Sequence, residues 1–92
     1  MFYERLLDLA PALGARVSHA AAIAEFKGPA AGLALLDEIE GAAVKTYQPY
    51  WAVRAHLLKE LGRRREATGA FDRAIGLAED EAVRRFLLER RG

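Results

Sequence analysis

The stretch HLLKELGRRREATGAFDRAIGLA, residues 56–78, places one glycine and three arginines between two segments whose apolar residues recur three and four positions apart. That spacing predicts two amphipathic helices, and Gly62 suits the turn that joins them. Ala67, Phe71 and Ala74 lie on one face of the second helix. Small residues on such a face let two helices approach closely, while the large residue fills the space between them. The stretch therefore predicts a helical hairpin.

The rest of the chain has the same character. Apolar residues recur three and four apart almost throughout, β-branched residues are scattered, and there is no Asn to form an Asn-Gly hairpin turn. We therefore predict an all-α fold with about six helices. The expected helices cover about 2–10, 12–26, 29–39, 46–61, 64–78 and 80–91, with breaks at Pro11, Gly28, Gly41 and Gly62 and with N-caps at Thr46 and Asp80.

An internal repeat emerges when the sequence is shifted by 35 residues. The shift places Ala20 on Ala55, Ile23 on Leu58, Leu36 on Phe71 and Ile39 on Ala74. A helical hairpin that recurs at about 34 residues, with a small residue where its helices cross, is typical of tetratricopeptide-repeat (TPR) arrays. The match is partial, because Arg54 stands where the repeat usually has Leu and Glu79 where Pro is usual.

These observations predict a single TPR-like domain of antiparallel helix hairpins over residues 1–92. Its parts are a first degenerate repeat at about 12–40, a second at about 46–79, and flanking capping helices at about 2–10 and 80–91. Terminal elements of this kind cover the ends of a stacked array.

The composition argues against several classes of protein. Fourteen Lys and Arg against thirteen Asp and Glu give a formal net charge of +1, so we expect no specific DNA binding by this chain. Without cysteine there is neither a disulfide framework nor a thiolate metal site. The start MFYERLLDLA lacks the order of a signal peptide, and no apolar run is long enough to span a bilayer. We expect a cytoplasmic protein without membrane contact.

No arrangement of residues indicates catalysis. His19 and His56 lie on different repeats without His-x-x-x-His spacing, so no zinc site is expected. Ser18 lacks a Gly-x-Ser-x-Gly elbow, and the acidic cluster at 37–40 has no paired base. We therefore predict a protein that is not an enzyme, with no catalytic residue, metal ion or cofactor.

Two surfaces are candidates for binding. The first helices of the two hairpins would line a protein-binding groove whose residues are Val17, Ala21, Ala24, Glu25, Ala52, His56, Lys59 and Glu60. An exposed face without a ligand is the alternative interpretation of these positions. The second surface is the basic run Arg63, Arg64 and Arg65. We interpret this run as the solvated bend between two helices, in preference to a phosphate or acidic-partner site.

Four stretches are distinctive, and in chain order they are FYERLLDLAP, AEFKGPAAGLALLDEI, VRAHLLKELGRRREATGAFDRAIGLA and DEAVRRFLLERR. Together they resemble the C-terminal domain of bacterial extracytoplasmic-function (ECF) RNA polymerase sigma factors that carry a TPR-like extension. The most specific parts are Gly28 to Leu33 and Arg54 to Arg63. The chain departs from that family at Ser18-His19, where Asn-Arg is usual.

The resemblance implies a regulatory, non-catalytic domain that acts in transcription initiation through protein contacts. The implied partners are the sigma-factor core domains, RNA polymerase or a regulator, and a homodimer is a further option. Two alternatives stay open from the sequence. One is a stand-alone TPR-like adaptor for a protein or peptide, and the other is a small-ligand sensor that uses the groove.

Overall fold

The chain folds into α-helices joined by short turns. The computed structural model describes residues 2–92, with side chains from residue 12 onward. Its helices are α1 (Phe2–Lys27), α2 (Pro29–Asp37), the short 3-10 helix η1 (Ala42–Thr46), α3 (Gln48–Glu60), α4 (Arg64–Leu77) and α5 (Glu81–Arg91). No strand occurs within these bounds, so the prediction of an all-α fold is confirmed.

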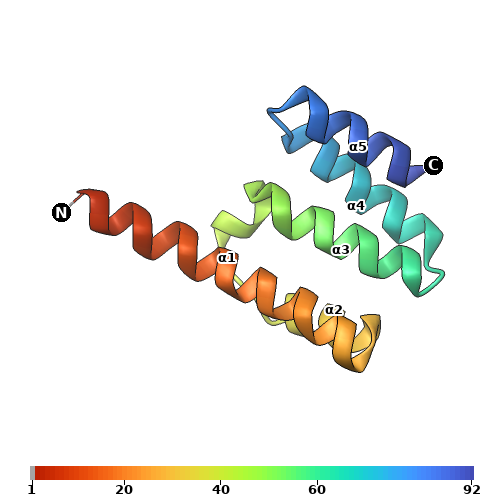
Figure 1. The fold of residues 1–92 in the computed structure, drawn as a ribbon, viewed down its shortest axis with the longest axis horizontal. Coiled ribbons are helices and arrows are strands. Elements are labelled where there is room, and N and C mark those ends of the chain that lie inside the picture. The colour runs from red at the N-terminus through yellow and green to blue at the C-terminus, as the bar shows by residue number, and fades with distance from the viewer. Residues whose placement is uncertain (1) are drawn as a thin grey trace.

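The helices pack as two stacked hairpins followed by one further helix (Figure 1). The first hairpin is formed by α1 and α2, the second by α3 and α4, and α5 packs on α4. Helix α3 contacts both helices of the first hairpin, so it joins the two hairpins into one body.

Helix α1 replaces the two helices that the sequence predicts over 2–10 and 12–26. Pro11 lies inside α1 and does not end it, so the predicted break is wrong and five α-helices stand where six are expected within residues 2–92. A proline costs a helix about 3 kcal/mol through its missing amide and its ring, but this cost does not forbid the helix. The Leu and Ala residues on both sides are strong helix formers. The side chains of the predicted capping segment at 2–10 lie outside the described side chains.

The turns lie where the sequence places them. Gly28 and Gly62 have φ of 100° and 78°, in the left-handed region that favours glycine, and Pro29 opens α2 directly after the first of them. Asp80 caps α5, because its Oδ1 accepts a hydrogen bond of 2.8 Å from the amide of Ala82. The N-cap predicted at Thr46 is wrong. That residue ends η1, and α3 begins one residue beyond Tyr47 without a side-chain cap.

The core is one continuous apolar cluster that passes through both hairpins. Seven of the eight positions related by the 35-residue shift are buried and belong to it, namely Ala20, Ala55, Leu58, Leu36, Phe71, Ile39 and Ala74. The eighth, Ile23, is half-buried. Alanines at the crossings let the paired helices approach, and the larger partners fill the remaining space.

The linker between the hairpins is held by one tryptophan and one arginine. Trp51 Nε1 donates a hydrogen bond of 3.1 Å to the carbonyl oxygen of Val44 in η1. Arg73 of α4 donates one of 2.8 Å to the carbonyl oxygen of Lys45, and its guanidinium lies 5.4 Å from the centre of the Trp51 ring. These contacts tie η1 to both helices of the second hairpin.

Candidate functional site

A groove of about 810 Å³ separates the C-terminal part of α1 from α3. It is lined by Ala21, Ala24, Glu25, Gly28, Pro29, Ala52, Val53, His56, Leu57 and Glu60. The hollow exists because both helices present alanines here, where larger side chains would fill the space between them. Its volume lies within the range of about 300–1,000 Å³ that is usual for ligand sites in proteins.

Six of the eight predicted groove residues line this groove. Val17 does not, because it is 3% exposed and packs in the core one turn before Ala21. Lys59 lies beside the groove, where its ammonium group donates a hydrogen bond to the carbonyl oxygen of Arg90 and its side chain lines a neighbouring hollow. Both placements correct the predicted groove.

Four lining residues were not predicted, namely Gly28, Pro29, Val53 and Leu57. The Gly-Pro turn, at which the chain folds back from α1 into α2 (Figure 1), contributes to the lining of the groove. The sequence indicates that Gly28 and Pro29 form a turn. It does not show that this turn lines a groove with residues of α3, because that depends on how the helices pack.

The ionisable side chains of the groove are two carboxylates and one imidazole. His56 Nε2 lies 3.3 Å from Glu60 Oε1, one helical turn away, and both side chains are about half exposed. Glu25 lies on the opposite side of the groove and is exposed. No Lys or Arg is among the lining residues, so the groove carries negative charge.

A second, smaller hollow of about 160 Å³ lies between α3 and α5. His56 and Ala52 line both hollows, so α3 forms the ridge between them. On the α5 side Phe86 is 54% exposed, and the guanidinium of Arg90 lies 5.2 Å from the centre of its ring. The sequence prediction did not include these two residues, although α5 spaces Phe86 and Arg90 one turn apart on a single face.

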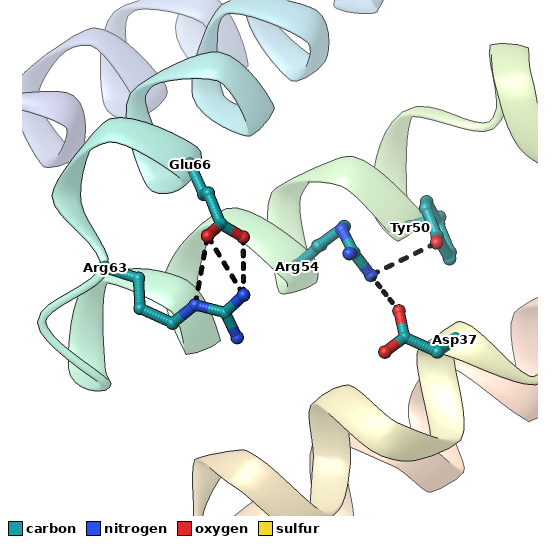
Figure 2. A network of polar contacts seen from close by, with 5 residues as sticks. All are labelled: Asp37, Tyr50, Arg54, Arg63 and Glu66. Atoms are coloured by element: carbon teal, nitrogen blue, oxygen red, sulfur yellow. Dashed lines mark hydrogen bonds and ion pairs between the residues drawn. The ribbon is translucent and has the colours of Figure 1, made fainter.

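Within the basic run, the described ion pairs involve Arg63 alone. Arg63 pairs with Glu66 in the first turn of α4 at 2.7 Å (Figure 2), and this acidic partner offsets the unfavourable effect of a cation at the start of a helix. Arg64 and Arg65 are exposed, and no hydrogen bond or ion pair joins either to another of the described side chains. The pairing of Arg63 with Glu66 and the exposure of Arg64 and Arg65 favour the solvated-bend interpretation.

Arg54, which stands where a TPR motif usually has Leu, joins the two hairpins. Its Nη1 donates a hydrogen bond of 2.7 Å to Oδ1 of Asp37 at the end of α2, and it lies 3.5 Å from the hydroxyl oxygen of Tyr50 (Figure 2). Burial lowers the pKa of Arg54, but the hydrogen bond to Asp37 and the charge interactions with Tyr50 and Asp37 outweigh it, so that the pKa is raised. The guanidinium therefore stays charged between the hairpins.

Within residues 2–92, no helix is long and apolar enough to cross a membrane. The described side chains contain no group of three or more His, Asp or Glu that could hold a metal ion.

No family model and no solved structure matches the chain. A comparison with curated proteins finds an uncharacterized protein of Rhizobium meliloti that is 40% identical over 78 residues. The matched segment is 85% of this chain and 18% of that protein. The chain therefore spans less than a fifth of the length of the relative that it matches.

Proposed function

We propose that this chain is a TPR-like protein-interaction domain that regulates an ECF-type RNA polymerase sigma factor and has no catalytic role. The observation that carries the proposal is the open groove between α1 and α3. These are the first helices of the two stacked hairpins, which are the helices that line the binding face of such arrays.

The repeat interpretation is supported by the core. The positions related by the 35-residue shift are buried or half-buried in both hairpins, and α3 packs on α1 and α2 as a stacked repeat would. Two repeats are fewer than the three or so that such arrays usually need for stability. Helix α5 supplies a further layer on the second hairpin, and a partner protein would complete the array.

The partner that we propose is the sigma-factor core domains of the same polypeptide. The four stretches that resemble the sigma-factor extension supply the reason for this choice. The curated relative, in which the matched segment is a small part of a longer chain, accords with a domain that works beside others. RNA polymerase, a regulator or a second copy of the chain are the other partners that the test must distinguish. Transcription would place this activity in the cytoplasm.

The test is a titration of the chain with separately expressed sigma-factor core domains, in which isothermal titration calorimetry measures the binding. We expect binding that the groove variant Ala21→Arg weakens and the neighbouring variant Ala22→Arg leaves unchanged. Ala21 lines the groove, whereas Ala22 is exposed about 100° around the same helix. If the wild-type chain does not bind the core domains, the sigma-factor assignment is wrong and a stand-alone adaptor is favoured.

A further inference from the structure

The groove between α1 and α3 is acidic at one end. Both helices run in the same direction (Figure 1), so their C-terminal ends lie at the same end of the groove. Glu25 lies in the last turn of α1, and Glu60 is the last residue of α3. The final carbonyl groups of a helix have no intrahelical partners and carry partial negative charge. Two carboxylates therefore lie at this end, together with the C-terminal ends of α1 and α3 and the N-terminal end of α2, whose first residue Pro29 also lines the groove.

The cations near this end do not neutralise it within the groove. Lys27 and Lys59 lie in the same last turns, and Arg64, Arg90 and Arg91 line smaller neighbouring hollows together with Glu60. None of these five residues lines the groove itself. Lys59 is turned toward α5, where it donates to the carbonyl oxygen of Arg90. His56 is 3.3 Å from Glu60 and offsets its charge only when protonated. A cation brought by a partner would complement this end, because interfaces pair opposite potentials.

The remaining surface of the groove is apolar. Three small side chains leave room above the core, namely those of Ala21, Ala24 and Ala52. The wall on α3 consists of Val53 and Leu57. A lysine or arginine can lay its methylene stem along such a surface while its charged head reaches a carboxylate. An apolar side chain next to it would fill the space above the alanines.

We propose that the groove recognises a protein segment in which a lysine or arginine lies beside an apolar residue. The cationic head binds at Glu25 and Glu60, and the apolar side chain occupies the hollow over Ala21 and Ala52. This inference rests on the proposed function, because it names the chemistry by which a protein partner is held in that groove. An acidic segment does not fit, since it would bring like charge to the acidic end. An uncharged polar segment does not fit either, because it would neither neutralise the carboxylates nor fill the apolar hollow.

A selection from a library of random short peptides displayed on phage tests the inference, with the full chain as bait. We expect the selected peptides to share a basic residue next to an apolar one. The affinity of a selected peptide, measured by fluorescence anisotropy, should fall about tenfold in the Glu25→Gln/Glu60→Gln variant, which corresponds to about 1.4 kcal/mol. The matched control is Glu79→Gln/Glu89→Gln, which removes two exposed carboxylates outside the groove and should leave the affinity unchanged.

The inference is overturned if no peptide is enriched, if the enriched peptides lack a basic residue, or if both double variants bind equally well. Circular dichroism of each variant checks that the fold is kept. The titration with sigma-factor core domains separates this result from the function. If the core domains bind but the selected peptides lack a basic residue, only the proposed groove chemistry is overturned. If the selected peptides combine a basic and an apolar residue but the core domains do not bind, only the sigma-factor assignment is overturned.

Discussion

Replacing Gly32 by alanine should destabilise the protein, although the same change stabilises most helices. Gly32 is buried in α2, where it faces α1 and α3. A Cβ atom at this position would lie 2.6 Å from Ala24 Cβ, 2.7 Å from the backbone oxygen of Ala20 and 3.1 Å from Leu57 Cδ1. The oxygen belongs to the backbone of α1, so it cannot move unless the two helices separate.

The size of the effect follows from two opposing contributions. In an ordinary helix interior, alanine is more favourable than glycine by about 0.5–1 kcal/mol because the unfolded chain has less freedom to lose. Overpacking a close helix crossing costs about 1–3 kcal/mol. Overlap with both a backbone atom and a Cβ atom places Gly32→Ala toward the upper part of that range. We therefore expect a net loss of about 1–2 kcal/mol in the free energy of unfolding.

Urea denaturation followed by far-UV circular dichroism measures this change, and thermal melts provide a second measure. In a domain of this size each kcal/mol lowers Tm by about 4–8 °C. Gly69→Ala in α4 is the matched control, because Gly69 is exposed and an added Cβ would meet nothing within 4 Å. That variant should gain about 0.5–1 kcal/mol. A Gly32→Ala protein as stable as the Gly69→Ala protein would refute the close α1–α2 crossing.

Four further outcomes are expected. Phe71→Ala should lower the free energy of unfolding, measured by denaturant titration, by about 3–5 kcal/mol because the ring is 3% exposed. The control Phe26→Ala, at a side chain that is 87% exposed, should change it by less than about 0.5 kcal/mol. A double-mutant cycle on Arg54 and Asp37 should give a coupling energy of only about 0.2–1 kcal/mol, since the carboxylate is 57% exposed. Because the folded state raises the pKa of Arg54, the part of that contribution that depends on the charge of Arg54 is fully present below the pKa of Arg54 in the unfolded chain, and it is lost as the pH rises through the higher pKa of the folded state in strongly alkaline solution. A loss between neutral and mildly alkaline pH would contradict the Arg54–Asp37 contact. Asp80→Ala should cost about 0.5–2 kcal/mol through loss of the cap on α5, and thermal melts that coincide with the wild type would show that the cap contributes nothing. Titration with promoter-length duplex DNA should show at most weak binding that falls steeply with salt, and tight sequence-selective binding would contradict the protein-interaction proposal.

The sequence by itself determined the elements whose causes are local. The hairpin turn at Gly62, the Gly28-Pro29 junction and the cap at Asp80 follow from backbone preferences of single residues. The buried faces of α3 and α4 follow from apolar spacing, because a helix places residues three and four apart on one side. These preferences act within one turn of chain, so they can be recognised without knowing the neighbours.

The tertiary structure decided the features that depend on packing between helices. Val17 and Ala21 share one stripe of α1, yet one lies in the core and the other in the groove, because only the position of α3 determines where that stripe is covered. Arg54 is unexpected for a TPR-like pattern until α2 brings Asp37 to it across 17 positions of sequence. Pro11 stays within α1 because its local cost is finite and the rest of the helix outweighs it. In each case the free energy that decides the outcome comes from residues distant in the chain or from a whole helix. A local sequence pattern therefore cannot predict that outcome.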